Sequence, residues 1–483
     1  MHGSIRPFSA RMSPWCASLL AAVFLLAGAA RYADGAQRRT STADDRNSLS
    51  ITIYNSNLGL VKDVREIELP RGIVDLDFED VAASIDPTSV YIRSLDHPAG
   101  LTVLEQNFEF DLISPAKLME KYLGHTVELI TLVDDKEVVR EGRLIGIEGG
   151  YVYEMDGKIA VNPPGRVVMP ELPEGLISRP TLVWMLENGP PRHTVEASYL
   201  TGGISWKSNY VMVLAEDDKT IDLSGWVTID NRSGATYEDA SVKLVAGDVN
   251  RVEEQRRPKM LAEMAVGRGA APQFEEQAFF EYHLYTLQRK STIKDRQTKQ
   301  IGLLDAEDVS VKKSYVYQPR VSWWFSAMNG PDKSTKVGVF LSMANSEENG
   351  MGMPLPKGVV RVYKKDEDKA LQFIGEDSID HTPADETIRV KLGEAFDIVG
   401  ERAQTHYRVL ASGHLYESSY KVTLRNHKDE PVVVLVIESI PGDWTIVEKS
   451  HDYEKETSNR VRFDVPIEAK GAAELTYTVQ IKY

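Results

Sequence analysis

The sequence contains very little cysteine and no excess of basic residues, and each shortage excludes a class of function. A single Cys among 483 residues allows neither an internal disulfide nor a cysteine metal cluster. The 56 Lys and Arg are outnumbered by 72 Asp and Glu, which gives a formal net charge of −16. A chain this acidic is poorly suited to general binding of DNA or RNA phosphates, so we expect no nucleic-acid partner. With 42% hydrophobic and 27% charged residues, it is neither membrane-filling nor disordered.

Recognisable catalytic and cofactor motifs are also missing. The sequence has no Gly-x-Ser-x-Gly elbow, no His-Glu-x-x-His motif, no P-loop and no EF-hand loop. The ten His are scattered without metal-ligand spacing. We therefore predict no cofactor and lean towards a protein that is not an enzyme. A pair of Asp or Glu of the glycosidase kind stays open, because acidic residues are plentiful and the sequence singles out no pair.

The longest apolar stretch predicts an export signal. Arg6 and Arg11 precede an apolar run over residues 17–30 that ends in small residues. This order is typical of a secretory signal peptide, here residues 1–30, and the run is shorter than the roughly 20 apolar residues of a membrane span. Removal of the signal would take away the only Cys and leave a net charge of −18. We expect a thiol-free mature chain without a transmembrane segment, located in the periplasm or outside the cell.

Alternation of apolar and polar residues predicts an all-β fold built of β-sandwich domains. Residues 49–53 and 74–79 alternate in this way, as half-buried strands do. We expect a flexible lead-in over 31–48, an N-terminal β segment over 49–111 and a C-terminal β-sandwich region over 180–483. The N-terminal β segment is too small to bury a sandwich core alone, so we expect it to pair with strands of the C-terminal region.

Residues 112–173 have a different pattern, which predicts an inserted small barrel of the SH3 or Sm-like kind. Ser114 can cap a helix, Pro115 suits its first position and Gly124 suits its end, and five short strands follow. Barrels of the Sm-like kind often bind RNA. This segment has seven Lys and Arg against ten Asp and Glu, so we prefer a spacer or protein-interaction module.

Three features mark the C-terminal region. Strands end in Asn at positions 231, 345 and 426, and we interpret these residues as turn formers, because Asn tolerates the left-handed conformation. The run 431–437 is apolar on both faces, which predicts a central strand covered on both sides. Residues 251–277 begin with a helix-like pattern and continue through glycines, so we expect a short helical or mobile insertion.

Two tryptophans are candidates for ligand binding. Strand alternation places Trp226 on the same face as Ser224 and Thr228, and Trp324 on the same face as Ser322 and Ser326. An aromatic ring on an otherwise polar face can stack on a sugar or anchor a protein partner, here an envelope glycan or an envelope protein. The alternative is that another segment covers both rings.

One acidic stretch is a candidate metal site. Glu376, Asp377, Asp380 and His381 cluster within a few residues, and carboxylates with an imidazole suit a hard or transition-metal cation. The alternative is a turn, because Asp and Thr side chains can bond the nearby backbone and a proline follows. The sequence favours the turn.

Several stretches together resemble one family. They lie at residues 201–206, 223–228, 243–249, 352–358, 375–377, 381–383 and 426–428. The chain resembles the bacterial secreted proteins of the domain-of-unknown-function 4139 family, and its C-terminal half is similar to mucoidy-inhibitor-A-like proteins. The resemblance implies a bacterial source, a β-rich fold and an envelope or extracellular setting, and it brings no catalytic residues. We expect an exported, non-enzymatic binding or scaffolding protein of the cell envelope. The alternative is a carbohydrate-active enzyme that uses Asp or Glu on envelope polysaccharide.

Overall fold

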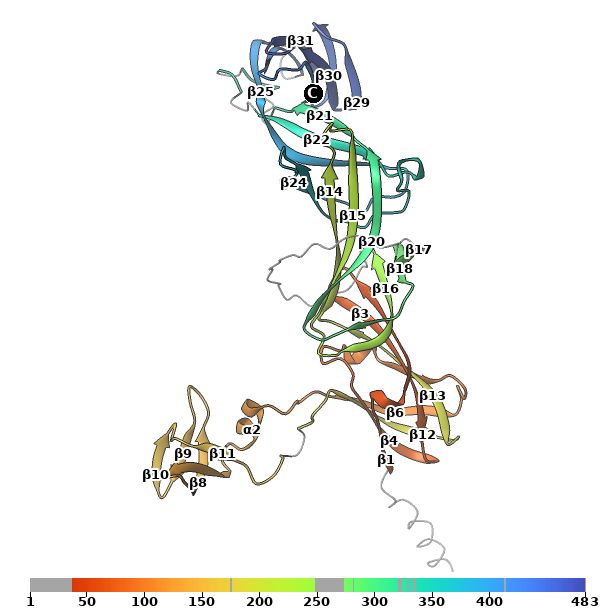
Figure 1. Cartoon of the computed structure of the whole chain (residues 1–483), viewed down its shortest axis with the longest axis vertical. Helices are drawn as coiled ribbons and strands as arrows, with labels where there is room; N and C mark the ends of the chain where they lie inside the picture. Colours follow the sequence, from red (N-terminus) through yellow and green to blue (C-terminus); the bar gives the residue numbers. More distant parts are fainter. Residues whose placement is uncertain are drawn as a thin grey trace, which may run out of the picture. The chain divides into compact units, whose positions relative to one another are not determined.

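The fold is all-β and sandwich-like, as predicted: about 66% of the computed structural model is strand and 4% is helix, in several sheets (Figure 1). The structure describes residues 37–173, 176–247, 273–280, 282–319, 324–327, 330–332, 336–411 and 414–482. The predicted signal peptide and residues 31–36 of the lead-in lie outside this set. The chain divides into two compact units. Unit 1 comprises Met1–Ser50, Leu60–Gly202 and Ser233–Tyr237, and unit 2 comprises Ile51–Gly59, Gly203–Arg232 and Glu238–Tyr483.

The described residues of unit 1 form the first thirteen strands, two 3-10 turns and one α-helix. The strands, of which β2 and β3 also contribute residues to unit 2, are β1 (Gln37–Ser41), β2 (Arg46–Tyr54), β3 (Leu58–Glu68), β4 (Gly72–Glu79), β5 (Tyr91–Ser94), β6 (Leu101–Glu109), β7 (Thr126–Val133), β8 (Lys136–Gly146), β9 (Val152–Met155), β10 (Lys158–Val161), β11 (Arg166–Val168), β12 (Thr181–Asn188) and β13 (Arg192–Thr201). The helix is α2 (Pro115–Lys121), and the 3-10 turns are Ala43–Asp45 and Pro87–Ser89.

Strands from distant parts of the sequence pair in unit 1. One sheet has the order β1-β4-β12-β6, in which β12 pairs antiparallel with both β4 and β6. Phe78 of β4 and Trp184 of β12 are fully buried and meet edge to face, with ring centroids 5.6 Å apart. In a second sheet, β13 pairs antiparallel with β5. These pairs confirm the expectation that the N-terminal β segment completes its sheets with strands from beyond residue 180.

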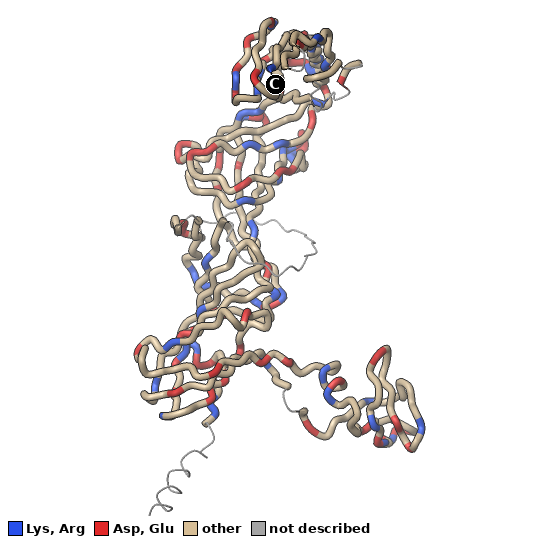
Figure 2. Tube along the Cα trace, turned by 180° about the vertical axis from the view of Figure 1, so that it is seen from behind, with Lys and Arg blue, Asp and Glu red and all other residues tan. Residues whose placement is uncertain are grey.

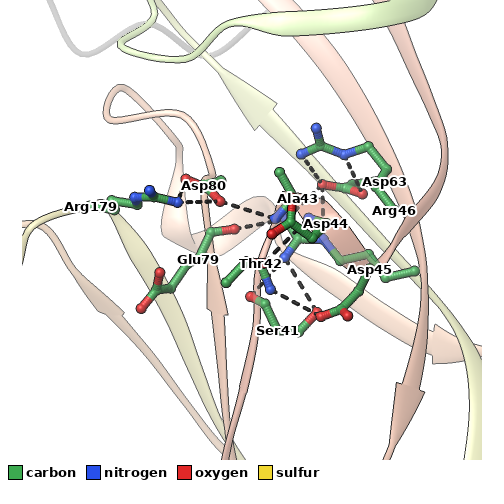
Figure 3. A network of polar contacts seen from close by, with 11 residues as sticks. Ser41, Thr42, Ala43, Asp44, Asp45, Arg46, Asp63, Glu79, Asp80 and Arg179 are labelled. Carbon is green, nitrogen blue, oxygen red and sulfur yellow. Dashed lines mark hydrogen bonds and ion pairs between the residues drawn. The ribbon is translucent and has the colours of Figure 1, made fainter.

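The flexible lead-in predicted for 31–48 is wrong from Gln37 onward. Strand β1 pairs parallel with β4, and a capping box follows in which Thr42 N–H donates to Asp45 Oδ2 (3.1 Å). Ala43 N–H donates to Asp80 Oδ2 (3.0 Å), and Arg179 pairs with the same carboxylate (2.8 Å) (Figure 3). This polar segment is ordered by hydrogen bonds to other polar residues, such as Asp80. Composition alone cannot reveal such contacts.

The insertion over 112–173 begins as predicted. Ser114 Oγ accepts a hydrogen bond from Lys117 N–H (3.2 Å), Pro115 occupies the first turn of α2, and Gly124 follows with φ of 87°. Five strands then form one antiparallel sheet in the order β10-β9-β8-β7-β11. Figure 1 shows α2 and these strands in the yellow and orange part of the chain.

The closed barrel predicted for the insertion is not formed. The sheet is open, since within residues 112–173 no hydrogen-bonded pair joins β10 to β11. These two strands have only four and three residues. Pro163 and Pro164 separate them and carry no N–H to donate. Too few backbone groups are left for a closing ladder.

Unit 2 contains the remaining strands and a 3-10 turn (Glu347–Asn349). The strands are β14 (Ile204–Leu214), β15 (Thr220–Asn231), β16 (Tyr237–Ala246, whose first residue belongs to unit 1), β17 (Phe274–Phe279), β18 (Tyr282–Leu287), β19 (Ser291–Ile293), β20 (Gln297–Ser310), β21 (Lys312–Tyr317), β22 (Lys336–Ala344), β23 (Gly358–Lys365), β24 (Leu371–Ile379), β25 (Thr387–Ala411), β26 (Leu415–Asn426), β27 (Val432–Ser439), β28 (Asp443–Lys449), β29 (Tyr453–Thr457), β30 (Arg460–Ile467) and β31 (Ala472–Lys482).

Unit 2 contains two large sheets, and residues of the nine-stranded sheet form a hydrophobic core. A five-stranded sheet has the order β20-β15-β14-β23-β24, and a nine-stranded sheet has the order β28-β31-β26-β25-β22-β21-β27-β30-β29. The nine-stranded sheet packs against itself, since Phe463 of β30 stacks on Tyr477 of β31 with centroids 5.3 Å apart. Strand β27 is central, as predicted, but its second face is covered only in part, at Ile437. Val434 is buried, while Val433 is 50% exposed.

The Asn residues at strand ends do not form left-handed turns. Asn231, Asn345 and Asn426 are buried, and none has a positive φ. Each donates from Nδ2 to two backbone carbonyl oxygens of other segments, at 2.8–3.3 Å. Asn188 of unit 1 does the same. These side chains act as clamps between segments, which a single sequence cannot distinguish from turn formation.

The predicted insertion over 251–277 is described only at its end. Residues 251–272, including the helix-like stretch, lie outside the described residues. Residues 274–277 form the start of strand β17, which pairs antiparallel with β18. In the part of the chain that the structure describes, no helix is long and apolar enough to cross a membrane.

Candidate functional site

Trp226 lies where strand alternation places it. It is half-buried on β15, between buried neighbours Gly225 and Val227, and opposite Asn209 of β14. On its face, Thr228 is buried and accepts a hydrogen bond from Asn209 Nδ2 (2.9 Å). Trp226 is therefore partly accessible on a polar sheet face.

Trp324 is not available as a surface anchor. It is only 2% exposed and belongs to the core of unit 2, where its ring meets Tyr420 edge to face (5.2 Å). The next residue, Phe325, is 38% exposed and packs edge to face on Tyr416 (5.1 Å). The prediction that Trp324 lies on an accessible face is therefore wrong. Here the chain is irregular and not a strand, so the alternation rule does not apply.

The four candidate metal ligands do not converge. Glu376 and Asp377 are consecutive on β24 and so point to opposite faces. Glu376 pairs with Arg361 (3.2 Å), and Asp377 Oδ2 accepts from Lys391 N–H (2.7 Å). Asp380 and His381 follow the strand, and His381 Nδ1 accepts from a backbone N–H (3.2 Å). Throughout the described ranges, no three His, Cys, Asp or Glu side chains lie close enough to hold a metal ion.

The turn interpretation of this stretch agrees with the structure. Thr382 Oγ1 donates to the Asp380 carbonyl (2.8 Å), and Thr382 pairs with Leu355 through two backbone hydrogen bonds. Asp385 takes a positive φ of 66° before β25 starts. The stretch after β24 therefore forms a corner between two strands.

One arrangement that the sequence did not reveal has the composition of a catalytic triad. His193 Nδ1 lies 2.9 Å from Ser94 Oγ, and its Nε2 lies 2.7 Å from Asn188 Oδ1. These residues come from β13, β5 and β12, so no local motif announces them. All three are buried, at 4% exposure or less. A substrate has no access to Ser94, and we interpret the group as a polar clamp between strands.

The insertion contains a hollow, and the geometry of this hollow follows from strand register. Val127 and Leu129 of β7 are buried in a small core with Met119 and Tyr122 near α2. In an antiparallel pair, directly opposite residues share a face. Gly142 lies opposite Val127, and a Cβ there would come within 2.9 Å of the side chain of Leu129. These residues identify which face of the sheet is the inner, core-facing one.

Beyond this core the inner face opens into a hollow of about 830 Å³. Its lining comes from β7, β8, β9 and β10 and from the loop before β11: Leu129, Ile130, Thr131, Leu132, Val133, Glu137, Arg140, Met155, Asp156, Lys158, Ala160, Pro163, Pro164, Gly165 and Arg166. Gly165 is required where the loop closes on β7. It has φ of 134°, and a Cβ there would lie 2.8 Å from Thr131 Cγ2.

Two cations occupy the inner face itself. Arg140 lies directly opposite Leu129, and Lys158 directly opposite Met155, so register places both on the core side. Glu137 and Arg166 form an ion pair (2.8 Å), whereas Arg140 and Lys158 make no ion pair within residues 112–173. Asp156 is the remaining acidic residue of the lining. The hollow is apolar at its floor and positively charged at its wall, within a segment of net charge −3. Figure 2 shows both signs of charge along the insertion.

The small core beside the hollow contains one more polar group. Tyr153 of β9 is 1% exposed, and its hydroxyl has no hydrogen-bond partner among the described residues. Burial raises the pKa of this phenol, so it stays protonated at neutral pH. The residues of the insertion thus cover only part of the inner face of its sheet.

Comparison with known proteins adds no identification. No family model matches the chain. No curated protein matches it either. The resemblance inferred from the sequence motifs therefore stays a prediction, and the functional argument rests on the geometry above.

Proposed function

We propose that the chain is an exported, non-enzymatic binding or scaffolding protein of the bacterial cell envelope, and that it captures a protein partner through the insertion. One observation carries the proposal. The insertion leaves an 830 Å³ hollow open on the inner face of its sheet, between two strands that have a neighbour on one side only. Hollows with an apolar lining and a few placed polar groups are the usual form of binding sites.

The proposal of export rests on the N-terminal sequence. Two arginines, a short apolar run and small residues occur in the order of a signal peptide. The near absence of Cys fits a mature chain whose stability comes from packed sheets. The family resemblance points to the same compartment.

The scaffolding part of the proposal rests on unit 2, where a buried ion pair serves the fold and does not face a ligand. Arg402 and Glu438 pair at 2.8 Å with side chains at most 2% exposed. Asp332 N–H donates to the Arg402 carbonyl (2.7 Å), which adds a backbone contact beside the pair. Groups buried to this extent contribute to structure and are not positioned to meet a ligand.

A deletion of the insertion tests the proposal. Ile113 N–H donates to Ile177 O (3.0 Å), and Ile177 N–H donates to Asp111 O (3.1 Å), so the two connecting segments already lie side by side. Replacing residues 114–176 with a short Gly-Ser linker should leave the remaining sheets folded. Cross-linking in the native host should recover a protein partner with the wild type and lose it with the deletion variant.

Two results would contradict the proposal. Undiminished recovery of the same partner by the folded deletion variant would remove the insertion as the binding site. Turnover of envelope polysaccharide by the purified chain, abolished by one Asp or Glu substitution, would establish the enzymatic alternative instead. The melting temperature of the deletion variant serves as the folding control.

A further inference from the structure

The outer strand β10 of the insertion is a free edge of its sheet. It pairs with β9 on one side only, and its Ile159 and Val161 are 62% and 67% exposed. Soluble proteins usually protect such edges with charges, prolines or a covering segment, because free N–H and C=O groups pair readily with another strand. Strand β11 is likewise paired on one side, with β7. An apolar edge of this kind next to a hollow is suited to strand addition.

The hollow supplies side-chain recognition next to that edge. Lys158 and Ala160 of β10 line it, as do Leu129 and Met155 from the inner face. A strand that lies along β10 points alternate side chains to the two faces of the sheet, so every second residue would enter the hollow. Those residues would meet an apolar floor and the two cations, Arg140 and Lys158.

Charge decides which segment fits. With Glu137 held by Arg166, the inner wall keeps two cations against one acidic residue, Asp156. A second copy of this chain pairing through the same face would bring Arg140 and Lys158 against their own equivalents. Like charges placed opposite each other are unfavourable. An acidic segment from another protein avoids this repulsion and satisfies the cations.

We propose that the hollow binds an extended segment of another protein in which acidic and apolar residues alternate, and that this segment adds as a strand to the free edge of β10. The inference rests on the proposed function and specifies its partner. Main-chain hydrogen bonds to β10 supply the affinity, and the pairing of acidic side chains with Arg140 and Lys158 supplies the specificity.

The test uses the purified full chain and a short capped fluorescent peptide that alternates Val and Glu. Fluorescence anisotropy should show saturable binding, with affinity about tenfold or more weaker for a peptide that alternates Val and Lys. N-methylation of alternate backbone amides in the Val-Glu peptide should abolish binding, because it removes the donors that pair with β10.

Charge reversal on the inner face provides the matched comparison. Arg140→Glu with Lys158→Glu should weaken binding of the Val-Glu peptide about tenfold or more and improve binding of the Val-Lys peptide. Arg143→Glu is the control. It lies on the same strand β8, faces outward opposite Glu154, and is 59% exposed, so it should change neither affinity. Unchanged circular dichroism confirms that each variant is folded.

Several outcomes would overturn the inference. These are no binding of the Val-Glu peptide, equal binding of its N-methylated form, or full competition by laurate, an anion with an apolar tail but no backbone amides. Self-association that Arg140→Glu abolishes would assign the hollow to a second copy. The proposed function fails separately, through the deletion experiment. If deletion of the insertion removes the cellular partner but the peptide does not bind, only strand addition is refuted.

Discussion

Unit 2 and the insertion each have an arginine on the core-facing side of a sheet, and the two arginines differ in what surrounds them. In unit 2, Arg402 of β25 is fully buried and faces Glu438 of β27 at 2.8 Å. Its guanidinium also lies over the ring of Tyr420, 3.8 Å from the centroid. In the insertion, Arg140 of β8 is exposed on the inner face and makes no ion pair within the described residues.

Electrostatics explains why the two environments behave differently. Burial alone would lower the pKa of Arg402, but the opposing Glu438 carboxylate more than offsets this effect and raises it, so the guanidinium stays charged. A sheet that packs against itself must supply such a counter-charge, because an unpaired buried charge is very costly. The small insertion does not close, so solvent can hydrate Arg140 until a partner replaces the water.

The comparison predicts opposite responses to loss of a charge in the two regions. Glu438→Ala should lower the free energy of unfolding of unit 2 by about 3–5 kcal/mol, because it leaves Arg402 buried without its carboxylate. Arg402→Met combined with Glu438→Leu should cost far less, since it removes both charges together. Urea unfolding followed by tryptophan fluorescence measures both. A loss below about 1 kcal/mol for the single variant would show that the pair is not buried as described.

The insertion should instead be most sensitive to loss of apolar volume. Leu144 is fully buried in a core of only six side chains among the described residues, so Leu144→Ala should cost the insertion about 2–5 kcal/mol. Hydrogen exchange should accelerate in β7 to β9 while β26 and β31 keep their protection. Ile145→Ala, the exposed neighbour on the same strand, is the control. Equal effects of the two variants would contradict the small core.

The Asn clamps are a further difference, because they join segments elsewhere in the chain and are absent from the described residues 112–173. Asn426→Ala removes the donor to the Glu430 and Glu468 carbonyls and should cost about 1–3 kcal/mol. Asn459→Ala, at an exposed position of the same unit, should stay within about 0.5 kcal/mol of wild type. Thermal melting compares them, and similar losses would refute the clamp.

Much of this fold could be predicted from the sequence, because strands have a strict period of two. The alternation at 49–53 and 74–79, the Ser114 cap and the strands of the insertion all follow local rules, and the structure confirms them. The pairing of the N-terminal β segment with later strands followed from its size. These properties depend on residues close together in the chain, or only on how much surface a segment of a given size can bury.

The features that could not be predicted depend on contacts between distant residues. The sequence predicts Asn345 to be a turn former, whereas the structure shows it donating to the carbonyls of Met353 and Pro383. Strand alternation predicts that Trp324 is exposed. The backbone at this position is irregular, and Phe325 is the exposed residue instead. The hollow needs the register of β7 with β8 and of β9 with β10, and it needs the sheet to stay open. None of these facts is encoded within a window of a few residues.

Asp218 forms an ion cluster that is only partly buried. It therefore lies between the buried Arg402–Glu438 pair and the exposed Arg140. Lys313 donates to its carboxylate at 2.6 Å and Lys364 also pairs with it, while the Asp218 side chain is 25% exposed. Burial would raise the pKa of Asp218, but the two lysines outweigh that effect and lower it below 3.8. A carboxylate with a lowered pKa stabilises the fold above its ordinary pKa, and that stabilisation is lost as the pH falls through the lower, folded value.

Asp218→Asn should therefore cost less than Glu438→Ala, Leu144→Ala or Asn426→Ala, about 0.5–1 kcal/mol at pH 7, because solvent screens a partly exposed cluster. The difference between variant and wild type should shrink as the pH falls below 3.8 and the wild-type carboxyl becomes protonated. Urea unfolding at a series of pH values measures it. A difference that stays constant into acid would mean that the asparagine perturbs packing and not charge. A loss as large as that of Glu438→Ala would mean that partial exposure does not screen the cluster, and the contrast between the buried Arg402 and the exposed Arg140 would then need another cause.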